Sequence, residues 1–312
     1  MLLIGAGFSA NWGGLLSKDI GSLFHGYCRN LQFENKDLLL TAETYERAWD
    51  QIMAQKDDEV RDSIVDKLVK VFEFHQRMIS QNTGSGSLRH THQTLIGLLR
   101  WEQTSNDLVV TTNQDVLLES LHFELGHGKF RLLTPGVAEA ERDETNGSWR
   151  YRCRDVPGTF PTIERPERTL PLLKLHGSFD WRIDGKPIMI TGVNKEPDKW
   201  PPYLMQCFDY LDDWLKDGEV DLIVIGHALA DNYLVTLLKD KCNDSWRIFI
   251  IDPAHPHDWF HSKVSPMGTA LMAAIKCYLP VSFREIVDQV SPPTAAYRLF
   301  DSEILRVLRD TA

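Results

Sequence analysis

The chain has 312 residues, a formal net charge of −10, 43% hydrophobic residues and 25% charged residues. This composition is ordinary for a globular protein with a sizeable core. The negative charge argues against broad nucleic-acid binding as the main role. No apolar run reaches the length of a membrane span, and no basic region followed by an apolar run marks a secretory signal at the N-terminus.

The five cysteines are scattered, and none forms a C-x-x-C pair (Cys28, Cys153, Cys207, Cys242 and Cys277). A structural zinc ribbon is therefore excluded, and a reduced cytoplasmic compartment is expected. The segments 90–92 and 255–257 each hold two histidines, but neither has a nearby cysteine or a convincing third ligand. We expect no metal site.

Residues 2–10, Leu-Leu-Ile-Gly-Ala-Gly-Phe-Ser-Ala, predict a short buried strand that breaks at two glycines and enters a helix. Such a turn lets the backbone approach a ligand closely, and the helix N-terminus attracts phosphate. Gly5, Gly7 and Ala10 fit a loose form of the dinucleotide fingerprint. No acidic residue ends a second strand about 20 residues later, so an ordinary NAD dehydrogenase is not expected.

Apolar residues at spacings of three and four predict helices over 36–56 and 58–80, which we expect to form a hairpin apart from the sheet. We interpret residues 34–85, approximately, as a helical insertion. Residues 82–88 predict a flexible joint, and 91–103 a further helix.

Apolar strands are predicted at 107–111, 172–175, 221–225 and 246–251. An irregular insertion is expected over about 128–170, with a hairpin near 149–153, and a loop-rich stretch runs from the strand at 172–175 to about 203. The remaining segments predict helices (116–125, 204–217, 232–242, 266–278, 282–290 and 294–309). Strands that alternate with helices predict an α/β fold, a Rossmann-like doubly wound parallel sheet, in a single domain over 1–312.

Four of the predicted strands end in glycine or in polar residues, at Gly5, Asn113, His176 and Gly226. Ligands of open parallel sheets bind beyond the carboxyl ends of the strands. We therefore expect these four ends to face one crevice.

The chain resembles the sirtuin superfamily in four short motifs that occur in the family's order. They are Gly-Ala-Gly-Phe-Ser at 5–9, Thr-Asn-Gln-Asp at 112–115, Lys-Leu-His-Gly-Ser at 174–178 and Gly-His-Ala-Leu at 226–229. The resemblance spans about residues 2–255. It implies a sirtuin-like fold and a site that cleaves the bond between nicotinamide and ribose in NAD+.

The resemblance also implies a role for each matching residue. His176 would be the general base, and Asn113 would contact the ribose or orient a water. The other residues would bind NAD+: Gly5, Ala6, Gly7 and Ser9 at the phosphates, Phe8 near the nicotinamide ribose, Asp115 at the carboxamide, and Gly226 and His227 along the adenosine side. Asp252 ends its strand and is placed to accept hydrogen bonds from the adenosine ribose.

Structural interpretations of the same residues stay open. Asn113 and Asp115 precede a predicted helix and suit its N-cap, and His176 suits a core position. Asp252 precedes a proline and could start a turn. Arg150, Arg152 and Arg154 alternate along a strand, which favours a solvated basic face over a nucleic-acid contact. The apolar stripes at 38–53 and 60–79 favour helix packing or an oligomer interface.

The chain departs from the family's deacylases in two respects. It cannot form their four-cysteine zinc module, and Trp12-Gly13-Gly14 stands where they continue with proline, aspartate and phenylalanine. The helical segment at 36–80 resembles that of bacterial sirtuin-like proteins of anti-phage defence, in which water replaces the acyl oxygen. The resemblance therefore implies a zinc-free cytoplasmic NAD+ hydrolase, with NAD as substrate.

Constant destruction of NAD+ would be toxic, so we expect control by homo-oligomer assembly or by a regulatory partner protein, without a membrane. Two alternatives remain open. One is a zinc-free deacylase or ADP-ribosyltransferase, and the other is a module that senses NAD or ADP-ribose without turning it over.

Overall fold

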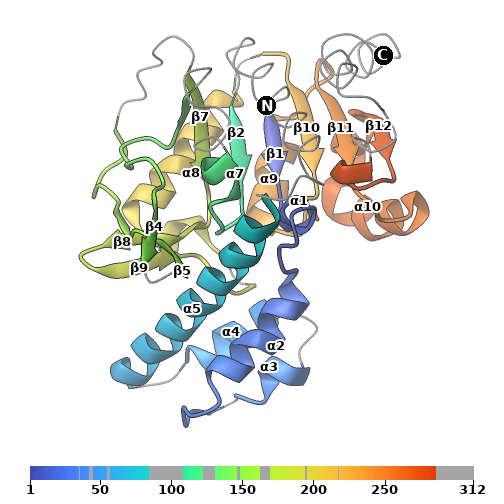
Figure 1. Cartoon of the computed structure of the whole chain (residues 1–312). Coiled ribbons are helices and arrows are strands. Elements are labelled where there is room, and N and C mark those ends of the chain that lie inside the picture. Colours follow the sequence, from blue (N-terminus) through green and yellow to red (C-terminus); the bar gives the residue numbers. More distant parts are fainter. Residues whose placement is uncertain are drawn as a thin grey trace.

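The computed structural model describes residues 1–34, 36–41, 45–54, 57–83, 108–121, 131–145, 148–161, 169–193, 195–216 and 218–285. In this part of the chain, seven strands form a parallel sheet in the order β12-β11-β10-β1-β2-β7-β3 (Figure 1). The strands are β1 (Leu2–Ile4), β2 (Val109–Thr111), β3 (Arg131–Leu133), β7 (Thr169–Lys174), β10 (Asp221–Ile225), β11 (Arg247–Ile251) and β12 (Ile275–Leu279). The predicted Rossmann-like parallel α/β sheet is confirmed.

Both faces of the sheet are buried because successive strand residues enter different cores. Leu3, Val110 and Val224 belong to a core shared with the helices α8 (Pro202–Trp214), α9 (Asn232–Lys241) and α10 (Pro256–Ala273). Leu2 and Val109 belong to a second core, which includes side chains of the short helices α1 (Ala6–Ala10) and α7 (Leu117–Leu121). The sheet is therefore covered on both sides, as the apolar strands predict.

A group of helices lies beyond the end of the sheet at which α1 begins (Figure 1). It comprises α2 (Ser17–Tyr27), α3 (Leu38–Thr41), α4 (Tyr45–Ile52) and α5 (Asp58–Thr83). These helices share a third core, in which Phe24, Ile52 and Leu68 are buried and which also includes Val116 and Phe179. We call these helices the helical module. The segment predicted as one helix over 36–56 contains α3 and α4, and α5 is the helix predicted over 58–80. The module also includes α2, which precedes these segments.

The smaller strands lie in the segment expected to be irregular and in the loop-rich stretch after it. β4 (Arg142–Thr145) and β5 (Ser148–Tyr151) pair as an antiparallel hairpin, which confirms the hairpin predicted near 149–153. β8 (Gly177–Ile183) pairs with β6 (Arg154–Asp155) and with β9 (Lys186–Met189). A 3-10 helix, η3, spans Pro197–Lys199. The stretch up to about 203 is thus more regular than expected.

The helix predicted at 266–278 is wrong at its end. The structure has α10 to Ala273 and then β12, which pairs in parallel with β11 through Phe249 and Cys277. Pairing with an open sheet edge outweighs the local helical pattern there. The predictions at 91–103 and 294–309, and most of those at 82–88 and 282–290, lie outside the described residues.

Between β1 and β10 the order in which strands are added to the sheet changes sides. From β1 the chain proceeds to β2 and β7 on one side, and β10 and β11 lie on the other. Gly5 follows β1, Gly226 follows β10, and the Gly7 N–H donates to the Gly226 carbonyl at 2.9 Å. Gly226 has φ +58, and a Cβ there would lie 2.5 Å from the Gly7 carbonyl carbon. Glycine at this junction therefore lets two turns pack backbone to backbone.

We predict that Gly226→Ala destabilises the protein by about 1–3 kcal/mol from backbone strain alone, with the clash against the 5–8 turn in addition. Chemical denaturation followed by circular dichroism measures the change. Gly26→Ala is the matched control, because a Cβ at Gly26 meets nothing within 4 Å and Gly26 lies in α2. Equal midpoints for the two variants would contradict this account of the junction.

Candidate active site

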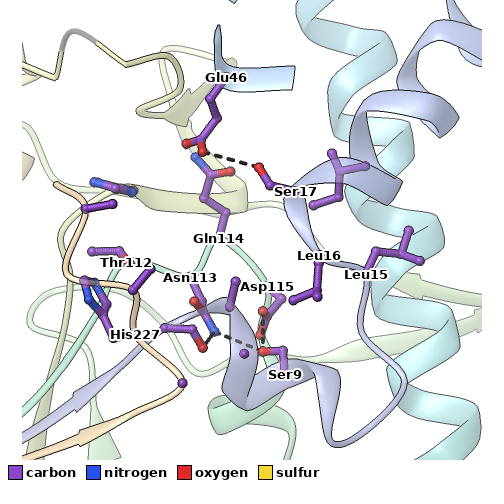
Figure 2. A pocket seen from close by; sticks show the side chains of 18 of the residues that line it. Ser9, Leu15, Leu16, Ser17, Glu46, Thr112, Asn113, Gln114, Asp115 and His227 are labelled. Carbon is purple, nitrogen blue, oxygen red and sulfur yellow. Dashed lines mark hydrogen bonds between the residues drawn. The ribbon is translucent and has the colours of Figure 1, made fainter. Parts of the chain in front are cut away.

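A cavity of about 480 Å³ lies between the carboxyl ends of the central strands and the helical module. Its lining includes Gly5, Asn113, His176 and Gly226, the four strand ends that the sequence predicts to share one crevice. The opposite wall comes from the helical module and the loop before α2, and Figure 2 shows Leu15, Leu16, Ser17 and Glu46 on that side. The volume is in the range usual for sites that bind small molecules, about 300–1,000 Å³.

Asn113, Ser9 and Asp115 form one hydrogen-bonded group on the sheet side (Figure 2). The Asn113 side-chain amide donates to the Gly5 carbonyl and to the Ser9 hydroxyl, at 3.0 Å each. Ser9 in turn donates to Asp115 Oδ2 at 2.7 Å. In the described part of the chain, Asn113 Oδ1 has no hydrogen-bond donor, so this oxygen is available to a water or a ribose hydroxyl.

Asp115 is both a helix cap and a cavity residue. Its Oδ1 accepts the Leu117 N–H at 3.0 Å, at the start of α7. Burial opposes its ionisation, but His75, Lys174 and the Ser9 hydroxyl outweigh burial and hold the pKa of Asp115 below its ordinary value. The capping role considered from the sequence and a position in the cavity are therefore compatible.

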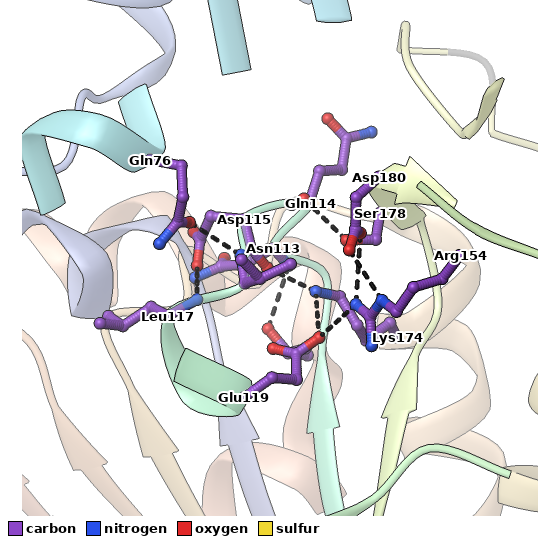
Figure 3. Close-up of polar contacts among 12 residues, drawn as sticks. Gln76, Asn113, Gln114, Asp115, Leu117, Glu119, Arg154, Lys174, Ser178 and Asp180 are labelled. Atoms are coloured by element: carbon purple, nitrogen blue, oxygen red, sulfur yellow. Dashed lines mark hydrogen bonds and ion pairs between the residues drawn. The ribbon is translucent and has the colours of Figure 1, made fainter. Parts of the chain in front are cut away.

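Four buried charged groups support the loop between β2 and α7 that carries Asp115 (Figure 3). Lys174 donates to the Asp115 backbone carbonyl and lies 3.0 Å from Glu119 Oε1. Arg154 contacts Asp180 at 2.7 Å and Glu119 at 3.2 Å, and its side chain is only 3% exposed. The expected solvated basic face is therefore wrong for Arg154, because two carboxylates draw its side chain inside.

His176 lies at the end of β7 and is neutral at neutral pH. Burial lowers its pKa to about 3, although the carboxylate of Asp231, 3.7 Å from Nε2, opposes the change. Nε2 also lies 2.7 Å from the Tyr233 hydroxyl. Burial raises the pKa of Tyr233, so the tyrosine stays protonated and donates this hydrogen bond. The lone pair of Nε2 is the acceptor.

Asp231, Lys195 and Glu46 are site residues that the sequence analysis missed. Lys195 Nζ lies 3.0 Å from Asp231 and 2.8 Å from Glu46, which belongs to α4. Burial works against ionisation of Asp231, but His176, Lys195 and His227 lower its pKa to about 2. The three residues are far apart in the sequence, and Lys195 lies in a stretch interpreted as loop, so no local signal marks them. Their ion pairs link α4 of the helical module to Asp231 on the sheet side of the cavity.

Some residues proposed from the resemblance line the cavity and one does not. Ala6, Gly7, His227 and Asp252 are in the lining. Asp252 Oδ1 also accepts the Ala254 N–H at 2.8 Å, so Asp252 does start a turn. Phe8 is fully buried against Trp12 and Phe283 in the core, and the structure does not bring its side chain into the cavity.

The lining of the cavity is acidic. Among its described residues, four carry carboxylates (Glu46, Asp115, Asp231 and Asp252) and one, Lys195, is a cation held by two of them. Such a lining favours a positively charged group, or a reaction that develops positive charge, over a purely anionic ligand.

Within the described residues, no three histidine, cysteine or acidic side chains are arranged to hold a metal ion. None of the helices in the described residues has the length and apolar character needed to cross a membrane.

Comparisons with known proteins give likenesses of fold only. No family model and no curated protein matches the chain. Among solved structures, a mutant of a Sir2 homologue in complex with ADP-ribose is 13% identical with a TM-score of 0.45, over 98% of this chain and 92% of that one. A second ADP-ribose complex is 15% identical (TM-score 0.43, 97% and 94%), and a 2'-O-acetyl ADP-ribose complex is 16% identical (TM-score 0.44, 97% and 93%).

The low pKa of His176 predicts a pH dependence of stability. His176 has a folded pKa of about 3 and an ordinary value of 6.5. Between these values the unfolded chain binds more protons, so the free energy of unfolding falls as the pH decreases below 6.5, by at most about 1.4 kcal/mol per unit. His176→Gln keeps an acceptor near Tyr233 and does not titrate. Denaturant titrations from pH 7 to pH 4 should show a shallower slope for this variant, and identical slopes would contradict the assignment.

Proposed function

We propose that this protein hydrolyses NAD+ to nicotinamide and ADP-ribose in the cavity at the junction of β1 and β10. One observation carries the proposal: the cavity gathers Asn113 and Asp115, which follow β2, and His176, which follows β7. The sirtuin resemblance assigns His176 and Asn113 to the side of the attacking water and Asp115 to the side of the leaving nicotinamide.

The charge of the cavity supports this chemistry. The nicotinamide ring of NAD+ is a cation, and cleavage of its bond to ribose develops positive charge on the sugar, as in other glycoside cleavages. The acidic lining stabilises both cations in a site that is partly closed to water. We assign Asp252 Oδ2 to a ribose hydroxyl, since Oδ1 already accepts the Ala254 N–H.

His176 serves as the base in this proposal. A water on the ribose face opposite the leaving nicotinamide passes its proton to Nε2, directly or through the Tyr233 hydroxyl. Asp231, 3.7 Å from Nε2, then stabilises the imidazolium. The Asn113 Oδ1 orients the water or the ribose without adding charge. The proposed reaction uses these side chains, NAD+ and one water.

The biological part of the proposal rests on the resemblance of the helical segment to bacterial sirtuin-like defence proteins. The chain would deplete NAD+ in the cytoplasm during phage infection, as a homo-oligomer or under the control of a partner protein. Glu46 and Lys195 connect the helical module to Asp231, which lies beside the proposed base His176. A change in the helical module could therefore alter the surroundings of the base.

One observation favours a second candidate, a module that binds NAD or ADP-ribose without turnover. The Tyr233 hydroxyl already occupies Nε2 of His176 at 2.7 Å. If this hydrogen bond persists with ligand bound and Tyr233 does not relay a proton, His176 cannot act as a base. A deacylase or transferase would instead require an acyl-lysine or another acceptor before nicotinamide is released.

The test is incubation of the purified chain with NAD+, with quantification of nicotinamide and ADP-ribose by chromatography. His176→Ala and Asn113→Ala should each lower the rate by about 10²-fold or more, because each removes a group needed in the transition state. His257→Ala is the matched control, since His257 is an exposed histidine outside the cavity lining.

Full activity in either cavity variant would contradict the assigned roles. Tight NAD+ binding by the wild type without any product, both alone and in a lysate of the infected native host, would favour the sensing module.

A further inference from the structure

His75, on α5, is a buried side chain with an unsatisfied hydrogen-bond donor. Its Nδ1 accepts the Leu15 N–H at 3.0 Å, so Nδ1 carries a lone pair and the proton is on Nε2. The side chain is 3% exposed, and Nε2 has no hydrogen-bond partner in the described part of the chain. A buried donor without a partner costs stability and calls for an explanation.

A ready acceptor lies beside this donor. His75 Nε2 is 3.6 Å from Asp115 Oδ2, which is too long for a hydrogen bond. Oδ2 already accepts the Ser9 hydroxyl at 2.7 Å, and a carboxylate oxygen can accept a second hydrogen bond. The lowered pKa of Asp115 keeps this oxygen ionised. Both residues line the cavity, so a donor and an acceptor stand next to each other at its wall.

The local structure holds His75 in this place. The imidazole ring lies against Gly14, where a Cβ would be 3.1 Å from His75 Cε1. One face of α5 is fastened to the loop between α1 and α2 by the Leu15 N–H and, two turns later, by Asn82, which donates to the Trp12 carbonyl at 3.0 Å. The donor is therefore fixed before a ligand arrives.

A primary carboxamide on a flat ring complements this pair. Its carbonyl oxygen accepts from His75 Nε2–H, and its N–H donates to Asp115 Oδ2. Leu15, Ile20 and Phe72 line the same cavity and provide apolar contacts for a ring. A carboxylate in place of the amide would face Asp115 with like charge.

We propose that His75 is a specificity-determining residue, the donor to the carbonyl oxygen of the ring carboxamide, beside Asp115, to which the sirtuin resemblance already assigns that carboxamide. This inference rests on the proposed function, because the carboxamide is that of the nicotinamide ring of NAD+. It assigns to the helical module a direct part in substrate recognition.

Two substitutions at His75 separate recognition from structure. In His75→Asn the shorter amide replaces Nδ1 and keeps the acceptor for Leu15, but the donor at the Nε2 position is lost. In His75→Gln the longer amide replaces Nε2 and keeps that donor, but the bond to Leu15 is lost. If His75 acts as the donor, His75→Asn is the more damaging variant. If His75 acts only through its bond to Leu15, His75→Gln is the more damaging variant.

Three dinucleotides serve as probes: NAD+, its 3-acetylpyridine analogue, and the analogue whose pyridinium ring carries no substituent. The first two carry the carbonyl oxygen and the third does not. We expect His75→Asn to lower kcat/KM about tenfold for the first two and to leave the third nearly unchanged, while His75→Gln keeps most activity on all three. Each variant is compared with the wild type on the same dinucleotide, so differences in leaving-group reactivity cancel.

Equal losses on all three dinucleotides, greater damage in His75→Gln than in His75→Asn, or no loss in His75→Asn would overturn the inference. Calorimetric affinities of the same three dinucleotides supply a readout that does not need turnover. If the wild type binds NAD+ without cleaving it and His75→Asn weakens only the two carbonyl-bearing ligands, the proposed hydrolysis fails and the recognition role stands. If the wild type binds none of the three, the recognition role fails.

Discussion

The close contact of two glycine turns at the β1–β10 junction determines where everything else in this protein can lie. The Gly7 N–H meets the Gly226 carbonyl at 2.9 Å, and a side chain on Gly5 or Gly226 would collide with the opposite turn. Because the turns meet backbone to backbone, the carboxyl ends of β1 and β10 together form the base of the cavity. Because the Gly7 N–H makes this contact, Gly7, the second glycine of the turn, has a structural role in packing the two turns together.

Asp115 connects the layers of the site above these strand ends. Its two oxygens hold the start of α7 and the Ser9 hydroxyl, and Lys174 fixes its backbone carbonyl from below. His75 approaches it from the helical module. A similar arrangement surrounds Asp231, between His176 and Lys195. In both places a carboxylate is kept ionised by cationic or hydrogen-bonding neighbours, which gives the cavity its negative field.

The sheet and the meeting of its strand ends could be predicted because they follow from local signals. Apolar runs such as 221–225 end in glycine or polar residues, and parallel strands bring such ends together. The wall of the cavity opposite the sheet could not be predicted. Glu46 and His75 reach the cavity only through tertiary packing of the helical module, and Lys195 reaches it from the stretch between β9 and η3. β12 forms because the edge of β11 is open to it. Phe8 has the sequence position of a ligand contact, but its ring is buried against Trp12.

The position of bound NAD+ tests the central claim most directly. A crystal structure of the Asn113→Ala variant with NAD+ should show the nicotinamide ring with its carboxamide between His75 and Asp115. The adjoining ribose should lie beside His176, and the adenosine should extend past Gly226 toward Asp252. Density for NAD+ in another part of the molecule, or with the nicotinamide and adenosine ends exchanged, would contradict the account.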